Sequence, residues 1–167
     1  MATLSVTNIF NLSKATLVKF GALDWIADAV ADAIANSESV GNRICGLYYL
    51  ESYCLQLKSG RVRGDIEPIV SQEKAGIVRV DAKFGFAQPA FQKGIVPARD
   101  AALKNGICSL AIGHAHTCTS LGYFTEQIAK SNLIGIGFTN ASPIVAAPGG
   151  KSRIIGTNPI RSEEHTS

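Results

Sequence analysis

The stretch Ile107–Thr119, which reads ICSLAIGHAHTCT, joins a short apolar run to a polar segment that contains two histidines. The apolar run 107–112 is bounded by Gly106 and Gly113, and this pattern predicts a buried strand. The polar segment then leads into a stretch with helical character. We expect part of an active site in this segment, because ligands of α/β proteins bind beyond the carboxyl ends of the strands.

The chain around this stretch alternates between strands and helices. Apolar patterns predict three strands, at 77–80, 107–112 and 133–138. Helical patterns predict two helices between them, at 89–104 and 120–131, with a kink or break at Pro97 in the first. This order predicts an α/β fold in which helices cover a sheet. No G-x-G-x-x-G motif follows a strand, so the sequence does not support an ordinary Rossmann dinucleotide site.

The first third of the chain carries helical patterns only. Three helices are predicted, which begin at Ser5 or Thr7, at Asp24 and near Cys45. Asp24 is expected to be the N-cap of the second helix, and residues 60–71 form a polar connection. We therefore predict a small N-terminal helical segment over 1–70, followed by a sheet-and-helix domain over 71–160.

Composition limits the class of protein. The chain has 167 residues, of which 46% are apolar and 17% are charged, as in globular proteins. The net charge of +3 is spread without a basic run, so no nucleic-acid partner is indicated. The longest apolar runs are about six residues, against roughly 20 for a membrane span, so no membrane partner is expected. The four cysteines match no zinc or redox spacing, and without a signal peptide we expect reduced thiols in a cytoplasmic protein.

His116 is the first candidate for chemistry. Its imidazole suits general acid/base catalysis near neutral pH, and the alternative is a hydrogen-bonded structural histidine at a strand end. His114 and His116 alternate along an extended segment, so they point to opposite sides if the strand continues that far. A metal site formed by His114, His116 and Cys118 is a third interpretation.

Cys45 and two similar polar loops complete the candidates. Cys45 lies at a predicted helix start, where a thiolate is favoured, although the lack of a basic partner favours an inert buried thiol. The loops Thr139-Asn140 and Thr157-Asn158 flank the glycines of Pro148-Gly149-Gly150, where a backbone can approach a ligand closely. Each loop is either a ligand contact or a polar turn.

Four motifs in the second half of the chain together resemble one protein family. They are LGYFTEQIA at 121–129, LIGIGFTNASP at 133–143, PGGK at 148–151 and GTNP at 156–159. In this combination they resemble the type-2 malate/L-lactate dehydrogenase family, which includes ureidoglycolate and sulfolactate dehydrogenases and piperideine-2-carboxylate reductase. The resemblance extends from about Thr3 to Ile160 and is strongest after Asp81.

The resemblance implies an NAD(P)-dependent oxidoreductase with a non-Rossmann dinucleotide-binding fold, commonly a homodimer. The implied reaction transfers a hydride between nicotinamide and C2 of a 2-hydroxy or 2-oxo acid such as malate, lactate, sulfolactate or ureidoglycolate, and cyclic imines are also possible substrates. The implied cofactor contacts are Thr139, Asn140, Ala141, Thr157 and Asn158. The sequence does not decide between NAD and NADP.

The chain departs from the family pattern in its implied substrate residues. A Ser-His-Gly segment of the family, with an arginine three residues after the His-Gly pair, aligns here with Cys45 in place of the histidine and Tyr49 in place of the arginine. Arg43 is the candidate to substitute for that arginine. The second family histidine aligns with Thr117, but His116 stands one residue earlier, so the resemblance implies His116 as the acid/base, with Thr117 beside it.

The length adds a further expectation. Family members are about twice as long, which implies that this chain corresponds to an N-terminal half with an incomplete site and an exposed apolar face. Residues 161–167, RSEEHTS, share nothing with the family and are interpreted as a non-native tail. The alternative to a dehydrogenase is a non-catalytic nucleotide- or partner-binding remnant.

Overall fold

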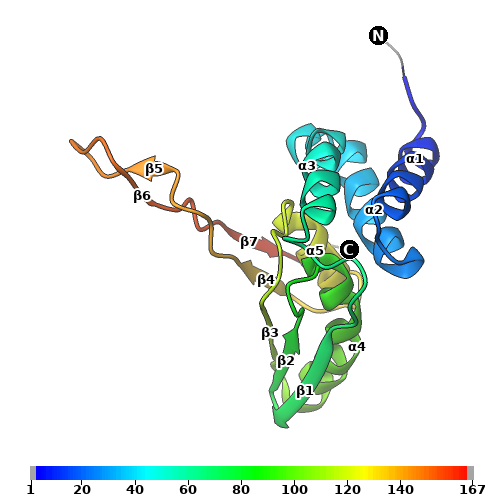
Figure 1. Cartoon of the computed structure of the whole chain (residues 1–167). Coiled ribbons are helices and arrows are strands. Elements are labelled where there is room, and N and C mark those ends of the chain that lie inside the picture. The colour runs from blue at the N-terminus through cyan, green and yellow to red at the C-terminus, as the bar shows by residue number, and fades with distance from the viewer. Residues whose placement is uncertain (1–2, 165–167) are drawn as a thin grey trace. The chain divides into compact units, whose positions relative to one another are not determined.

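The computed structural model describes residues 3–164, which divide between two compact units, Met1–Ser120 and Leu121–Ser167. The elements of both units are labelled in Figure 1. No helix in the described part of the chain is long and apolar enough to cross a bilayer. The cysteines at 45, 54, 108 and 118 are all free.

The first unit begins with a helical layer. It contains α1 (Val6–Lys19), α2 (Asp24–Ser39), the 3-10 turn η1 (Arg43–Cys45) and α3 (Leu47–Lys58). Ser5 caps α1 by accepting a hydrogen bond from the Asn8 amide at 3.1 Å, so it is the N-cap of the two residues, Ser5 and Thr7, that the sequence offered as helix starts. Asp24 was expected to cap α2 and does not, because Leu23 occupies the cap position. The Asp24 carboxylate instead pairs with Lys14 Nζ at 2.9 Å.

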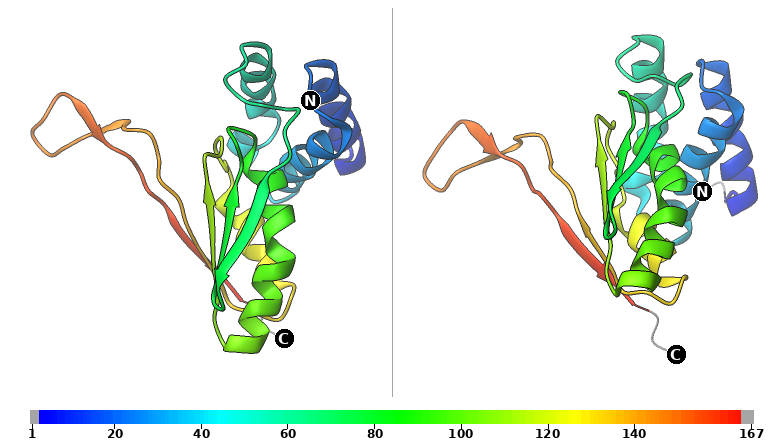
Figure 2. Two further views of the ribbon diagram at one scale, coloured as in Figure 1. Left: turned by 60° about the horizontal axis from the view of Figure 1, so that its bottom comes forward. Right: turned by 90° about the horizontal axis from the view of Figure 1, so that it is seen from below.

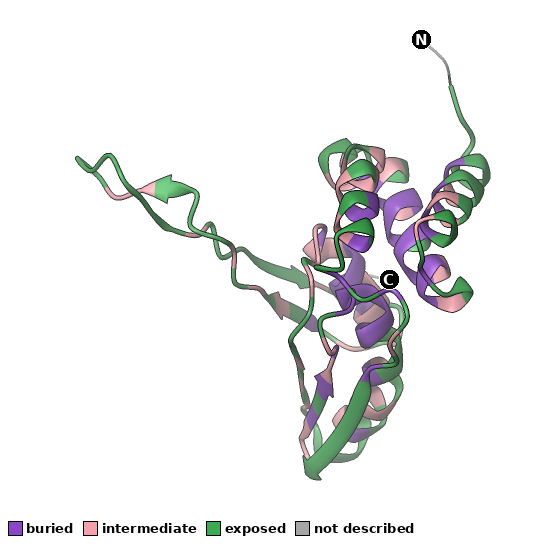
Figure 3. Ribbon diagram, in the orientation of Figure 1, coloured by how far each residue is buried: buried purple, intermediate pink, exposed green. Residues whose placement is uncertain are grey.

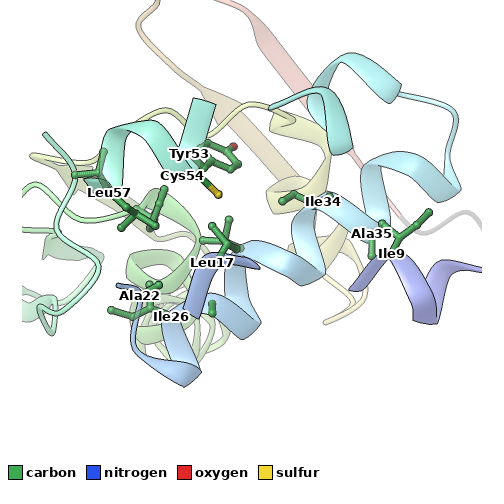
Figure 4. Close-up of a cluster of buried hydrophobic side chains, with 13 residues drawn as sticks. Ile9, Leu17, Ala22, Ile26, Ile34, Ala35, Tyr53, Cys54 and Leu57 are labelled. Atoms are coloured by element: carbon green, nitrogen blue, oxygen red, sulfur yellow. The ribbon is translucent and has the colours of Figure 1, made fainter. Parts of the chain in front are cut away.

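The helices of this unit share a buried core with residues that follow them in the chain. Its buried cluster is drawn in Figure 4 and combines side chains from α1, α2 and α3 with Val62 and Phe86. Leu17 and Val30 are fully buried in it, and Tyr53 is 1% exposed. Because Phe86 directly precedes α4 (Ala87–Asn105), the helical layer and the sheet region share one core. The two compact units meet after Ser120, and the division of the chain near residue 70 stays a prediction.

A three-stranded sheet follows, in the order β1-β2-β3. Its strands are β1 (Ile69–Lys74), β2 (Ile77–Asp81) and β3 (Ser109–Gly113). β1 is antiparallel to β2, and β2 is parallel to β3, with Val80 opposite Ile112. α4 supplies the crossover and packs against the sheet, as both views of Figure 2 show.

Three predictions for this region differ from the structure. The expected polar connection 60–71 contains the start of β1, whose six residues are all exposed and so carry no alternating apolar signal. The strand near 107–112 is not buried, because only one face of β3 packs: Leu110 and Ile112 are half-buried against the cluster that contains Val80 and Ala90, and the alternate residues are exposed. α4 also continues past Pro97 without a break. Its contact face includes Gly94, where an added Cβ would lie 2.6 Å from Val80 Cγ2, so this part of α4 lies very close to β2.

The second unit is a helix with a long hairpin. It contains α5 (Leu121–Ala129), β4 (Gly135–Phe138), β5 (Val145–Ala146), β6 (Arg153–Ile155) and β7 (Ile160–Glu163). β4 pairs with β7 and β5 with β6, both antiparallel, so the chain runs out along β4 and β5 and returns along β6 and β7 (Figure 1).

The β4–β7 ribbon has two different faces. A Cβ on Gly135 would lie 2.8 Å from Thr125 O, and one on Gly137 would lie 3.0 Å from Thr125 Cγ2, so glycine lets α5 approach this face. The alternate residues Ile136 and Phe138, with Ile160 opposite Phe138, are 57%, 70% and 69% exposed. Figure 3 colours most of the hairpin as exposed. The expected exposed apolar face is therefore present on this ribbon.

The segment interpreted as a tail is partly structured. Arg161, Ser162 and Glu163 belong to β7 and pair with Gly137, Ile136 and Gly135. The side chain of Arg161 also pairs with that of Glu163. Residues 165–167 of the segment lie outside the described residues. The non-native origin of 161–167 stays a prediction, and its first residues complete a ribbon.

Candidate functional site

His116 lies on a loop that extends the β2–β3 pairing beyond the strand ends. The Ala82 amide donates to Gly113 O at 3.0 Å, and the His116 amide donates to Gly85 O at 2.8 Å. Phe86 and His116 then form an isolated parallel bridge. The loop after β2 and the loop after β3 therefore hold each other, and the histidine is fixed through its own backbone.

The ring of His116 lies among aromatic side chains of the first unit. Its centroid is 6.0 Å from that of Tyr53 and 6.1 Å from that of Phe86, both in edge-on geometry. The residue is half-buried, and its Nε2 atom is buried without a hydrogen-bond partner among the described residues. A buried polar atom without a partner is costly, and such atoms are typical of functional sites. The structural alternative, a histidine satisfied by hydrogen bonds, does not describe Nε2.

The environment of His116 favours its neutral form. Burial lowers the pKa of the imidazole from its usual 6.5, and the positive charge of Arg61 lowers the pKa further. At neutral pH a ring nitrogen is therefore available to accept a proton. This protonation state is the one that a general base requires.

A buried polar network fixes the residues that follow His116. Tyr53 Oη donates to Thr119 Oγ1 at 3.1 Å, and Thr119 Oγ1 donates to Cys118 O at 2.7 Å. Gln88 Nε2 donates to the same Cys118 carbonyl at 3.3 Å, and Gln88 also hydrogen-bonds with Tyr53. Burial raises the pKa of the Tyr53 hydroxyl, so this group remains protonated and serves as a donor.

Backbone strain is concentrated at the same loops. Lys83, Phe84, His114 and Thr119 have φ values of 49°, 64°, 50° and 55°, a region that side chains larger than glycine rarely adopt. Such strain persists only where the surrounding structure enforces it, and it clusters at functional sites. Two of these residues flank His116 in sequence.

Cys45 and Tyr49 come from η1 and α3. Burial is the main cause that raises the pKa of the Cys45 thiol, whereas a hydrogen bond with Asn42 lowers it and the nearby Cys118 raises it. Cys45 is thus a protonated thiol at neutral pH, as the inert interpretation expects. Tyr49 packs on the core, with its ring 5.7 Å from Tyr53.

Arg43 and Thr117 are both exposed. Arg43 has no ion pair among the described residues. The Thr117 hydroxyl accepts a hydrogen bond from the Thr119 amide at 3.3 Å, which places it in the turn that follows His116. A turn contact of this kind gives the hydroxyl no base to activate it.

The side chain of His114 pairs with Asp81, the last residue of β2. Its Nδ1 lies 3.0 Å from Asp81 Oδ1, and its side chain is 65% exposed. Within residues 3–164 there is no group of three or more His, Cys, Asp or Glu residues that could hold a metal ion. The metal site considered for His114, His116 and Cys118 is therefore not formed.

The loop residues of the second unit lie together at the middle of its hairpin. The Ala141 amide donates to Asn158 Oδ1 at 2.8 Å, and the Thr139 amide donates to Pro159 O at 3.4 Å. A Cβ on Gly156 would overlap the carbonyl of Ala141, so only glycine allows this close approach.

Four of these loop residues differ in solvent exposure. Asn140 and Thr157 are exposed, whereas Thr139 and Ala141 are half-buried. The two similar loops thus lie together and form one polar surface.

Sequence reasoning missed several residues of the His116 environment. Tyr53 and Gln88 build the network, Phe86 flanks the ring, and Arg61 acts on its charge. One signal was available for Tyr53, which follows Tyr49 by four residues on the same face of a predicted helix. Gln88 carried no comparable signal, because a glutamine beside Pro89 is usual at a helix start.

Known structures and proteins share this architecture. The structure is similar to Δ1-piperideine-2-carboxylate reductase from Pseudomonas syringae pv. tomato, with a TM-score of 0.92, 30% identity and coverage of 98% of this chain and 49% of that one. It is also similar to malate dehydrogenase from Pyrococcus horikoshii OT3, with a TM-score of 0.91, 27% identity and coverage of 99% and 47%.

The sequence has a similar relative in (2R)-3-sulfolactate dehydrogenase (NADP(+)) of Chromohalobacter salexigens. The two are 35% identical over 158 residues, which are 94% of this chain and 47% of the relative. The model of the malate/L-lactate dehydrogenase family matches residues 4–162. The chain therefore belongs to the malate/L-lactate dehydrogenase family, which confirms the family and the α/β fold class expected from the motifs. It spans about half the length of the relatives that it matches.

Proposed function

We propose that this chain contributes the proton-transfer part of an NAD(P)-dependent oxidoreductase that acts on 2-hydroxy or 2-oxo acids. The observation that carries the proposal is the buried, unpartnered Nε2 atom of His116. The family membership and the named dehydrogenases and reductases among the relatives support the reaction class.

The role of His116 follows from its chemistry. Oxidation of a 2-hydroxy acid breaks the C2–H and O–H bonds and forms a carbonyl. When bound, a nicotinamide would supply the hydride acceptor for oxidation at C2 and the hydride donor for the reverse reduction. The neutral His116 ring takes the hydroxyl proton at Nε2 and returns it when a 2-oxo acid is reduced. Because the ring is flanked by Tyr53 and Phe86, water around it is limited and its orientation is set by packing.

The polar surface of the second unit is the proposed cofactor contact. Thr139, Asn140 and Thr157 would supply side-chain hydroxyl and amide groups, while Asn158 holds the Ala141 backbone in place. A homodimer of the full-length protein is part of this proposal.

The test uses a full-length version of the protein and follows nicotinamide absorbance with NADH or NADPH and a panel of 2-oxo acids. His116→Ala is expected to lower the rate by roughly 10²- to 10⁴-fold, the usual contribution of a positioned acid/base. His114→Ala is the matched control, because its exposed ring pairs with Asp81 outside the site. A His116→Ala rate equal to that of the unaltered chain would refute the assignment.

A non-catalytic nucleotide- or partner-binding remnant is the second candidate. The observation that favours it is Tyr49, which packs on the core and offers no positive charge to a substrate. In the full-length protein, cofactor binding measured by nicotinamide fluorescence, without turnover of any acid in the panel, would support this candidate over the first.

A further inference from the structure

The backbone that carries His116 is strained on both sides of the histidine. His114 has a φ of 50° and Thr119 has a φ of 55°, a region that is costly for residues with a side chain. The segment 114–119 therefore keeps this conformation only while contacts from other parts of the first unit hold it. One such contact is made by His116 itself, whose amide donates to Gly85 O at 2.8 Å.

A second contact holds the segment two residues after the histidine. The Cys118 carbonyl accepts hydrogen bonds from Gln88 Nε2 at 3.3 Å and from Thr119 Oγ1 at 2.7 Å. Thr119 belongs to the same segment, so its hydrogen bond does not attach Cys118 to another element. Gln88 lies on α4, and its hydrogen bond therefore attaches the segment to that helix.

The start of α4 thus holds the histidine segment at two positions. Phe86, the N-cap residue of the helix, forms the parallel bridge with His116, and the two rings lie edge-on at 6.1 Å. Gln88, two residues after Phe86, holds Cys118, which is two residues after His116. Because α4 has 19 residues and packs against the three-stranded sheet, its first turn is a rigid support for these contacts.

Stability alone does not explain a glutamine at this position. The side chain of Gln88 is fully buried, and its Oε1 atom has no hydrogen-bond partner within residues 3–164. A buried acceptor without a donor lowers the free energy of unfolding, and an apolar side chain of the same length would avoid this cost. The amide is therefore placed for the contact that it makes with Cys118.

We propose that Gln88 is a positioning residue for His116, which holds the segment after the histidine so that Nε2 keeps the direction required for proton transfer. This assignment rests on the proposed function and adds to it the group that orients the acid/base. Because Gln88 is fully buried, it acts through Cys118 and does not touch the substrate.

The test measures the steady-state kinetics of a full-length version of the protein that carries Gln88→Met, with NADH or NADPH and the panel of 2-oxo acids. Methionine matches glutamine in length and removes the donor to Cys118, whose carbonyl keeps its hydrogen bond from Thr119. The variant is expected to fold, because an apolar side chain replaces an amide that has one unpartnered atom. Its kcat is expected to fall about 10- to 100-fold, the cost of a misplaced catalytic group, with KM changed by less than roughly twofold.

A second readout follows the orientation of the His116 ring directly. The ring lies edge-on to Tyr53 and Phe86, whose ring currents shift the NMR signals of the imidazole protons. These signals are assigned by their loss in His116→Gln, and Gln88→Met is expected to move them. A glutamine that served stability alone would change the midpoint of urea unfolding and leave these signals in place.

Gln56→Met is the matched control. Gln56 also has a buried Oε1 atom without a partner in the described part of the chain, but its Nε2 donates to Ser52 Oγ on the same helix, α3, at 3.2 Å. It makes no side-chain hydrogen bond with the segment 114–119 among the described residues. Gln56→Met is therefore expected to keep the kcat and the His116 signals of the unaltered protein.

The outcomes separate this assignment from the proposed function. A kcat of Gln88→Met equal to that of the unaltered protein overturns the role of Gln88 alone, and so do unmoved His116 signals. A Gln88→Met protein that is unfolded under the assay conditions also overturns it, since that result assigns the residue to stability. An unaltered full-length protein that turns over no acid in the panel overturns the proposed function and this inference together.

Discussion

Replacing Tyr53 by phenylalanine removes one hydroxyl from the network beside His116 and keeps the aromatic ring. The residue is 1% exposed, and its hydroxyl donates to Thr119 Oγ1 at 3.1 Å and hydrogen-bonds with Gln88. The Thr119 hydroxyl still donates to Cys118 O at 2.7 Å in the variant, so it does not become an unsatisfied donor. Loss of these buried neutral hydrogen bonds is expected to lower the free energy of unfolding by about 1 to 2 kcal/mol.

Urea unfolding followed by Trp25 fluorescence reports on the stability of the first unit, which contains Tyr53. Trp25 is the single tryptophan of the chain and lies on α2 in the first unit. With a slope of about 2 kcal/mol per molar urea, the midpoint is expected to fall by roughly 0.5 to 1 M at an unchanged slope. Tyr48→Phe is the matched control on the same helix, because Tyr48 is 77% exposed, and its midpoint is expected to stay unchanged. A Tyr53→Phe midpoint equal to that of the unaltered chain would refute the network as a source of stability.

Three further predictions concern charge, backbone and surface. The lowered pKa of His116 means that its contribution to the free energy of unfolding is present above pH 6.5. This contribution is lost as the pH falls from 6.5 through the folded-state pKa, and unfolding measured at a series of pH values will detect the loss. His116→Gln is expected to abolish this part of the pH dependence. Gly156→Ala is expected to push the two loops apart, and the Ala141 amide will then exchange its hydrogen faster. Phe138→Lys is expected to reduce self-association in light scattering without loss of stability, because this side chain is 70% exposed.

Each of these predictions has a control and a result that would contradict it. Asp81, whose pKa is lowered mainly by the Lys83 amide and then by His114, loses its contribution as the pH falls below its usual 3.8, whereas the contribution of His116 begins to fall below pH 6.5. Gly113→Ala should be neutral, since nothing lies within 4 Å of the added Cβ. Leu103→Lys, at a residue that is 64% exposed outside the ribbon, should leave association unchanged. An Ala141 exchange rate unaffected by Gly156→Ala, or association unaffected by Phe138→Lys, would contradict the corresponding contact or surface.

Local patterns predicted the elements that bury one face. α1, α2 and α3 were found from apolar spacing, because each packs a stripe of side chains on the shared core. β1 was missed because all its residues are exposed, so its pairing with β2 is the only sign of a strand. β3 has an apolar sequence but an edge position, and edge position depends on pairing that no short window of sequence contains.

The candidate site shows the same limit. His116 was found from its residue type and its place after a strand, and the two polar loops were found from their similarity. The structure brings these two loops together through the hydrogen bond from the Ala141 amide to Asn158 Oδ1. Arg61 and Gln88 could not be found in this way, because they lie 55 and 28 positions from His116 and reach it only through the fold (116 − 61 and 116 − 88). The domain assignments and the individual roles of the site residues stay predictions.

The hydrogen bond from Tyr53 to Thr119 has a consequence for the order of folding. It joins residues 66 positions apart, and the contact between Asn42 and Ser120 spans 78. Closing such long loops costs entropy before any contact compensates for it, so the helices can form early while these contacts wait for β3 to pair with β2. We expect Tyr53→Phe mainly to accelerate unfolding and to leave the refolding rate nearly unchanged. The environment of His116 would then be the last part of this unit to form and the first to be lost.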